Sequence, residues 1–295
     1  MKKYTMKDCR GLLYIMPWLL GFLLLQLYPF VSSLVYSFTD YSMMKTPNWV
    51  GLDNYIRLFT TDTEFKKSMA VTGLYALISV PAKLAFALLV AMVLNAKIRG
   101  INFYRTIYYL PSILGGSVAV SALWKIMFMK NGIVNSMIHV LGLGPVDWVG
   151  PKMALFTISL LQVWQFGSSM VLFLAALKNI PGELLEAAAI DGAGKIRIFF
   201  KVTLPMISPI IFFNLIMQSI NALQNFTSAF VVTNGGPMKS TYVMGMKLYT
   251  DAFNYFQMGY ASAQSWVLFA VILVLTALIF KSSDAWVYYE DGGDF

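Results

Sequence analysis

The stretch Pro181–Pro205, PGELLEAAAIDGAGKIRIFFKVTLP, decides how the rest of the chain is interpreted. Long apolar runs lie on both sides of it, yet it carries its own charged side chains, namely Glu183, Glu186, Asp191, Lys195, Arg197 and Lys201. A charge at the centre of a bilayer costs about 2.5 kcal/mol or more. The sequence therefore predicts a polar segment held between two membrane spans.

The first half of this segment has the local signals of a short helix. Pro181 suits a first turn, acidic residues lie near the start, and a run of Leu, Glu and Ala follows. Asp191-Gly192 predicts the end of the helix, because glycine adopts the left-handed conformation without a steric penalty. Small and apolar positions would give the helix a face that another surface can approach, formed by Leu184, Leu185, Ala187, Ala188 and Ala189.

The spacing of this segment resembles the EAA loop of ABC-importer permeases, E-A-A, three residues, G, nine residues, I, one residue, L-P. Here the matching positions are Glu186-Ala187-Ala188, Gly192, Val202 in place of isoleucine, and Leu204-Pro205. The resemblance implies a coupling helix that inserts into a cleft of a cytoplasmic ATPase subunit. It implies that Glu186 makes a charge contact and Gly192 forms the turn. The ATPase-coupling residues would be Glu183, Glu186, Ala187, Ala188, Asp191, Gly192, Leu204 and Pro205. The alternative is an ordinary amphipathic cytoplasmic loop.

Composition places the whole chain in a membrane. Of its 295 residues 58% are hydrophobic and 12% charged, against about 25% charged in soluble domains. Six apolar runs reach the about 20 residues that a spanning helix needs. The fold class predicted is all-α, a polytopic membrane protein with six transmembrane helices and a cytoplasmic coupling helix, like a type I ABC importer. It forms one domain, 1–295, with spans near 12–35, 69–94, 106–128, 154–177, 206–225 and 261–280, and the coupling loop at 181–205.

Basic residues in the connecting loops predict the orientation. Lys2, Lys3, Lys7 and Arg10 precede the first span, and further bases lie in alternate loops, at Lys97, Arg99, Arg105, Lys178, Lys195, Arg197, Lys201 and Lys281. The positive-inside rule makes this side cytoplasmic, with both termini. The net charge of +8 is thus explained by membrane topology, and no nucleic-acid partner is predicted.

Three further stretches resemble carbohydrate-type importer permeases, specifically the first of the two permeases of a heterodimer. They are Tyr28-Pro29 with the outer loop from Ser37 to Lys67, then Thr233–Pro237 (TNGGP) and Met258–Ala263 (MGYASA). In the outer loop a turn at Gly51 between aromatic residues predicts a small packed cap. The resemblance implies that the outer side meets a sugar-binding protein.

Amides concentrate in spans four to six. Asn214, Gln218, Asn221 and Asn225 follow a spacing of i, i+4, i+7 and i+11, which places them on one helix face. Amides beside aromatic side chains suit a neutral polyol, because they donate and accept hydrogen bonds. The candidate substrate path comprises Gln162, Trp164, Gln165, Asn214, Gln218, Asn221, Gln224 and Asn225. The alternative is hydrogen bonding between helices.

One charged residue lies near the middle of span two. Lys83 follows Pro81 by two residues, and a lysine at this depth should face protein or water. Lys83 could have one of two roles. Its side chain either contacts the translocation path or donates hydrogen bonds to backbone carbonyls that Pro81 leaves without a helical partner. The proximity of Pro81 favours the second interpretation.

The sequence offers no catalytic chemistry. Gly192-Ala193-Gly194-Lys195 lacks the upstream glycine and the Ser or Thr of a phosphate-binding loop. No enzyme activity, metal or cofactor is predicted for this chain; ATP and magnesium would bind partner ATPase subunits. The alternative function is an ion-coupled secondary carrier for a small neutral polar solute. It is disfavoured because no Asp or Glu lies inside the predicted spans, where a proton-coupled carrier needs titratable groups. Sodium coupling through carbonyls and amides stays open. A membrane scaffold without transport is a third, weaker alternative.

The interpretation is one transmembrane half of an ABC importer for a sugar or oligosaccharide, in a bacterial or archaeal cell membrane. The resemblance implies a second homologous permease, two ATPase subunits, an extracytoplasmic sugar-binding protein and membrane lipid as partners. A homodimer stays open. The sequence does not distinguish mono- from oligosaccharides.

Overall fold

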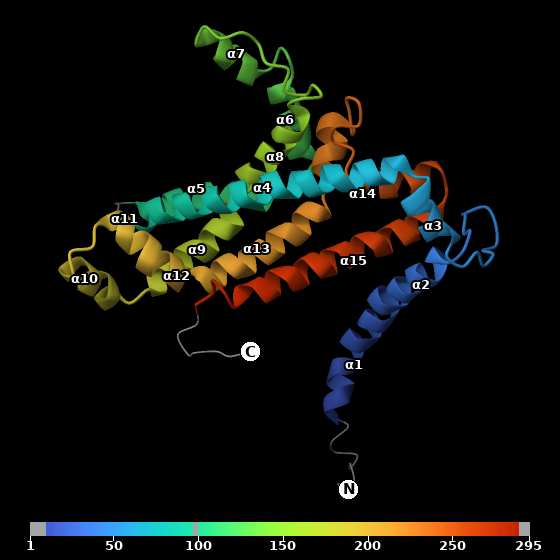
Figure 1. The fold of residues 1–295 in the computed structure, drawn as a ribbon, viewed down its shortest axis with the longest axis horizontal. Helices are drawn as coiled ribbons and strands as arrows, with labels where there is room; N and C mark the ends of the chain where they lie inside the picture. Colours follow the sequence, from blue (N-terminus) through green and yellow to red (C-terminus); the bar gives the residue numbers. More distant parts are fainter. Residues whose placement is uncertain (1–9, 97–99, 289–295) are drawn as a thin grey trace. The chain divides into compact units, whose positions relative to one another are not determined.

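The computed structural model describes residues 10–96 and 100–288. These residues form helices and no strand, with two isolated bridges, Thr39 with Trp49 and Ser42 with Lys45 (Figure 1). The predicted all-α class is confirmed. Part of the charge pattern behind the predicted orientation lies outside the described residues, namely Lys2, Lys3, Lys7, Lys97 and Arg99.

The chain divides into two compact units. The first comprises the described residues through Thr63 together with Leu248–Ala270, and the second comprises Glu64–Lys247 and the described residues from Val271 onward. The single domain 1–295 stays a prediction.

The first unit contains the N-terminal span and the outer loop that follows it. Its elements are α1 (Arg10–Phe22), a π-helical turn (Leu23–Leu27), α2 (Tyr28–Ser37), α3 (Asp53–Thr60), a π-helical turn (Thr250–Asn254) and the first half of α15 (Met258–Ser283). Residues Tyr14–Ser37 form one helix of 24 residues with the hydropathy of a span. Phe30 of α2 packs on Trp266 of α15, with ring centroids 4.7 Å apart.

The predicted cap over this span is present. Gly51 has a φ of +60°, and Trp49 stacks on Phe38 at 5.5 Å. The Asn54 side chain donates to the carbonyls of Ser37 and Thr39, at 2.9 Å each. Hydrogen bonds from Asn48 hold the pKa of the Asp40 carboxyl below its usual range. The loop is therefore fixed to the end of α2 by its own polar groups.

The second unit holds the remaining spans. Its helices are most of α4 (Thr63–Asn95), α5 (Ile101–Leu114), α6 (Val118–Phe128), α7 (Ile133–Val140), α8 (Ala154–Trp164), α9 (Gly167–Asn179), α10 (Gly182–Ile190), α11 (Lys195–Ile198), α12 (Leu204–Met206), α13 (Ser208–Leu223), most of α14 (Met244–Tyr249) and the second half of α15. Two π-helical turns lie at Phe199–Thr203 and Ala229–Thr233.

Three candidate spans are continuous helices and three are bent pairs, so the described residues reach six if each pair is one span. The pairs bend by 101° between α5 and α6, by 47° between α8 and α9, and by 66° at Ile207 before α13. The sequence predicted six apolar runs but none of these breaks. It also placed span five at 206–225, whereas its helical course begins at Lys195 and α13 ends at Leu223.

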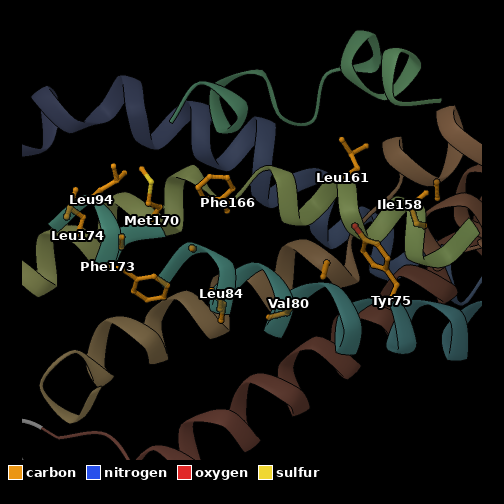
Figure 2. Close-up of a cluster of buried hydrophobic side chains, with 14 of the residues drawn as sticks. Tyr75, Val80, Leu84, Leu94, Ile158, Leu161, Phe166, Met170, Phe173 and Leu174 are labelled. Atoms are coloured by element: carbon orange, nitrogen blue, oxygen red, sulfur yellow. The ribbon is translucent and has the colours of Figure 1, made fainter. Parts of the chain in front are cut away.

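The core of the second unit joins α4, α8 and α9. Tyr75, Ile158 and Phe173 are completely or almost completely buried in it, and Figure 2 shows them with their neighbours. Phe86 of α4 meets Phe166, the residue at the bend before α9, edge to face at 4.8 Å. Packing of this kind holds the bent span against the long straight helix.

Candidate functional site

The short helix predicted after Pro181 is present as α10, which begins after Pro181 and ends before Asp191; its coupling role stays a prediction. Gly192 follows with a φ of +77°. The amide N–H groups of Asp191, Gly192 and Ala193 donate to carbonyls of the last turn at 3.0 to 3.1 Å. The left-handed residue therefore satisfies the helix end, which is the role that the sequence predicted for it.

The predicted coupling residues fall into two groups by exposure. Those on α10 and its end are largely exposed: Glu183, Glu186, Ala187, Asp191 and Gly192, with Ala188 half-buried. Two apolar side chains beside them are also exposed, Leu184 at 43% and Ile190 at 86%. Short acidic and apolar side chains thus share one short helix with little cover from the described residues.

The other two predicted coupling residues lie where the segment re-enters the bundle. Leu204 and Pro205 are half-buried in α12. The Ser208 hydroxyl donates to the Pro205 carbonyl at 2.6 Å, and this bond closes the bend at Ile207. Figure 1 shows α10 and α11 together at one end of the second unit, joined through α12 to α13. α10 is therefore connected to α13 through a short run of helical segments.

The amides predicted to share a helix face differ in burial, although Asn214, Gln218 and Asn221 all lie on the continuous helix α13. Asn214 and Gln218 are buried in α13, while Asn221 and Gln224 are exposed. Because α13 ends at Leu223, Asn225 is not on that helix face, and its place in the substrate path stays a prediction. The Asn214 side chain donates to its own helix at the Ile210 carbonyl, 2.9 Å away. The Gln218 side-chain oxygen is buried without a hydrogen-bond partner in the described part of the chain.

Gln162, Trp164 and Gln165 are half-buried at the end of α8, beside the bend. The rings of Trp164 and Trp124 lie 5.9 Å apart. A Cβ added to Gly115, at the bend between α5 and α6, would come within 2.8 Å of the Gln165 side chain. Two bent spans therefore meet at Gln165.

Sequence reasoning missed the residue that holds this junction. The Ser112 hydroxyl of α5 donates to the Gln165 carbonyl at 3.0 Å and accepts from the Ser168 amide at 2.9 Å. A bend leaves such backbone groups without helical partners, and in a membrane each unsatisfied group costs several kcal/mol. In the sequence, Ser112 could have been recognised by its position three residues before the Gly115-Gly116 pair, where a break in the helix can occur.

The surroundings of Lys83 differ from those that the favoured interpretation of the sequence predicted. It is buried, with 4% of its surface exposed, and α4 continues through Pro81 as one helix. No carbonyl among the described residues accepts a hydrogen bond from its ammonium group. The proline therefore does not supply the expected partners.

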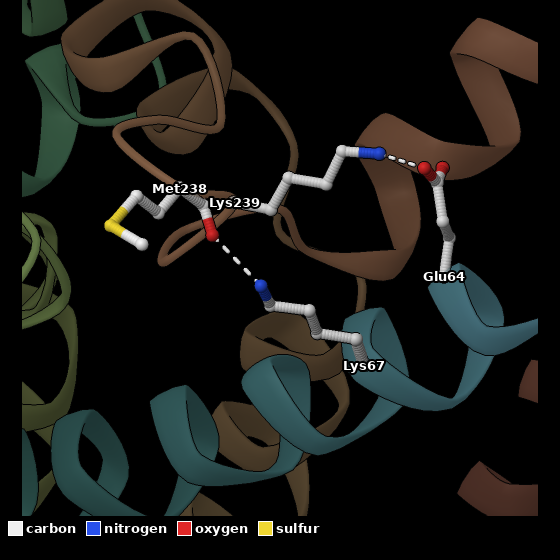
Figure 3. A network of polar contacts seen from close by, with 4 residues as sticks. All are labelled: Glu64, Lys67, Met238 and Lys239. Carbon is white, nitrogen blue, oxygen red and sulfur yellow. Dashed lines mark hydrogen bonds and ion pairs between the residues drawn. The ribbon is translucent and has the colours of Figure 1, made fainter.

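The TNGGP stretch forms a loop that is attached to the start of α4. Lys239 forms an ion pair with Glu64, and Lys67 donates to the Met238 carbonyl at 2.8 Å, as Figure 3 shows. The Met244 amide donates to the Thr72 hydroxyl at 2.8 Å. In the first unit, Gly259 of MGYASA approaches the cap so closely that an added Cβ would lie 2.1 Å from the Thr39 carbonyl.

Comparison with known proteins places this geometry in context. A family model described as "Binding-protein-dependent transport system inner membrane component" matches residues 74–291. "Probable ABC transporter permease protein YesP" of Bacillus subtilis (strain 168) is 47% identical over 284 residues, 95% of this chain and 92% of that protein. The diacetylchitobiose uptake system permease protein NgcF of Streptomyces coelicolor is 36% identical, covering 88% and 78%.

A solved structure has the same fold. A chain from a bacterial ABC transporter involved in the import of the acidic polysaccharide alginate aligns with a TM-score of 0.80 at 23% identity, covering 95% of this chain and 98% of its own. At that identity the likeness shows the fold alone.

Proposed function

Because the chain belongs to the family of binding-protein-dependent transport system inner membrane components, we propose that it forms half of the path through which an ABC importer moves a sugar or oligosaccharide across the membrane. The observation that carries the proposal is α10, an exposed helix of nine residues between two membrane segments, ended by Gly192 in the left-handed conformation.

Coupling to ATP hydrolysis is assigned to that helix. Its exposed apolar side chains, Leu184 and Ile190, would bury against an ATPase subunit, and Glu186 would supply a charge contact. Closure of two cytoplasmic ATPase subunits would pull α10, and the hydrogen-bonded path through α12 would move α13. ATP and magnesium bind those subunits, so this chain itself catalyses no reaction.

A sugar is the proposed cargo on two grounds. The names of relatives include permeases of diacetylchitobiose and lactose systems, and half-buried aromatic and amide groups meet at Trp164 and Gln165. A second, homologous permease would complete the path, and a sugar-binding protein would deliver the cargo from outside a bacterial or archaeal cell membrane. Both termini would lie in the cytoplasm.

The test is a pull-down of the tagged chain from its native membrane in mild detergent, with mass spectrometry of what is retained. An ATPase subunit and a second six-span permease are expected. The matched variant is Ile190→Asp, which puts a charge on the proposed contact and should lose the ATPase while keeping the second permease. Recovery of this chain alone, under conditions that preserve a known ABC complex, would overturn the proposal.

A further inference from the structure

Helix α3, in the cap that follows the N-terminal span, has an apolar stripe on its outward face. Its inward face is packed: Leu58 is completely buried, and Asn54 donates to two carbonyls at the end of α2. On the opposite face Leu52, Ile56 and Phe59 follow a spacing of i, i+4 and i+7. Their side chains are 59%, 56% and 56% exposed. Contiguous apolar surface that stays exposed indicates an interaction surface.

Polar contacts on the inward side hold α3 in one orientation. The Arg57 guanidinium donates to the Gln257 side-chain oxygen at 3.0 Å, and it lies over the Tyr260 ring, 4.1 Å from the ring centroid. Together with the bonds from Asn54, these contacts attach α3 both to the end of α2 and to the start of α15. Turning the stripe inward would break them, so the stripe stays on the outside of the first unit.

The span to which the cap is attached sets the depth of α3. Tyr14–Ser37 is a helix of 24 residues with the hydropathy of a span. At about 1.5 Å per residue it is about 36 Å long, which exceeds the about 30 Å of a hydrocarbon core. Its last turn therefore reaches the headgroup region. The Asn54 side chain lies 2.9 Å from the Ser37 carbonyl, so α3 begins at the same depth, beside the end of α2 (Figure 1).

Two neighbouring groups mark the boundary between hydrocarbon and water. Asp40 is exposed, and hydrogen bonds from Asn48 hold the pKa of its carboxyl below its usual range, so it stays charged on the aqueous side. Trp49 stacks on Phe38 at 5.5 Å and is 69% exposed. Tryptophan is enriched where hydrocarbon gives way to headgroups. Phe38 and Trp49 thus extend apolar surface from the end of the span to the cap.

The composition of the cap selects its partner. From Phe38 to Thr63 the chain has three acidic and two basic residues, Asp40, Asp53, Asp62, Lys45 and Arg57. This near balance of charge selects neither an anionic headgroup nor an acidic protein surface. An apolar helix face at headgroup depth, next to an exposed tryptophan, has the features of a helix that enters the boundary between headgroups and acyl chains.

We propose that Trp49, Leu52 and Ile56 insert into the lipid leaflet on their side of the membrane, which is the outer leaflet in the proposed orientation. The cap is then a lipid-bound anchor that fixes the depth of the N-terminal span. This inference goes beyond the proposed function and depends on neither the cargo nor the ATPase subunits. The competing occupants of the stripe are the second permease and a binding protein, and the experiment separates them from lipid.

The experiment measures what surrounds the stripe in the full chain. Leu52→Cys and Ile56→Cys, each in a Cys9→Ser background, are labelled with bimane and reconstituted, with the subunits that co-purify, in phosphatidylcholine nanodiscs. Nitroxide lipids with the quencher near the headgroup or at the end of the acyl chain are compared with aqueous iodide. The shallow nitroxide should quench about threefold more strongly than the deep one, because an interfacial helix enters only the outer part of the leaflet. Iodide should have little effect.

Asp53→Cys is the matched control. Its position is exposed and adjacent to Leu52 but lies about 100° around the helix, so iodide should quench its label more strongly than either nitroxide lipid. Monodisperse elution in detergent checks that each variant is folded. Nanodiscs with added anionic lipid should give the same pattern, because apolar surface and not charge selects this partner.

Two results would overturn the inference. Protection of the labels at Leu52 and Ile56 from both iodide and nitroxide would mean that protein covers the stripe, either the second permease or a binding protein. Strong quenching by iodide, with none by the nitroxide lipids, would place the stripe in water. Neither result changes which subunits the pull-down retains, so the importer proposal is decided separately.

Discussion

Gly192 is the residue whose backbone most restricts substitution in the coupling segment. Its φ is +77° and no atom lies near a Cβ built there, so a side chain would meet strain only from the backbone, about 1–2 kcal/mol for an L-residue. We expect Gly192→Val or Gly192→Asp to abolish ATP-dependent uptake while the chain still inserts. Uptake in proteoliposomes and immunodetection in membranes measure the two.

The control for this prediction lies two residues away. Gly194 has a φ of −69° and open space around it, so Gly194→Ala should transport normally. Asparagine and aspartate both tolerate the left-handed conformation, but asparagine adds no second charge beside Asp191, so Gly192→Asn should recover part of the activity that Gly192→Asp loses. Normal uptake by Gly192→Val would remove the coupling role from this turn.

The amides of α13 give a second prediction. Gln218→Leu and Asn221→Leu should change sugar affinity, or sugar-stimulated ATP hydrolysis, about fivefold, because each would remove a polar contact to the proposed cargo. Asn214→Leu should change neither, since that side chain bonds its own helix. Unchanged kinetics in both Gln218→Leu and Asn221→Leu would make these amides packing residues.

The sequence predicted some of these residues and not others for a physical reason. Gly192 was identifiable because a helix stop is a local signal, set by neighbouring residues. The surroundings of Lys83 were not, because the direction of a buried side chain depends on helices far away in sequence. Pro81 suggested carbonyl partners, yet α4 stays continuous there.

At the scale of elements, Ser112 is predicted to stabilise the bend between α8 and α9. Ser112→Ala removes two hydrogen bonds at once and should lower the free energy of unfolding by about 1–3 kcal/mol, seen as a lower melting temperature in detergent. Ser283→Ala, which removes an exposed hydroxyl bonded only to its own helix, should leave it unchanged. Equal melting temperatures for both variants would mean that the bend does not depend on Ser112.

The positions of the helices were predictable, while the bends were not. Six apolar runs and a polar insert follow from composition and length alone. The bend at Gln165 contains no proline. It is associated instead with a close tertiary contact, because a Cβ added at Gly167 would come within 2.7 Å of the Tyr108 carbonyl of α5. Such a close approach is visible only once α5 and α9 are packed together.

At the scale of the whole molecule, the orientation can be measured with single cysteines. The chain has one cysteine, Cys9, so Cys9→Ser provides a cysteine-free background. Met238→Cys and Ile190→Cys place thiols at positions that are 80% and 86% exposed. A membrane-impermeant maleimide should label the first in intact cells and the second only after permeabilisation. The reverse pattern would invert the proposed orientation.

The bend at Gln165 also has a consequence for how this protein is made. Neither α8 nor α9, with 11 and 13 residues, reaches the about 20 residues that cross a bilayer. As the chain leaves the ribosome, each half is too short to partition into lipid alone, and the backbone between them needs a donor and an acceptor. Ser112 is synthesised more than fifty residues earlier. We therefore expect the third span to remain beside the insertion machinery until the fourth arrives, so that the pair enters the lipid together.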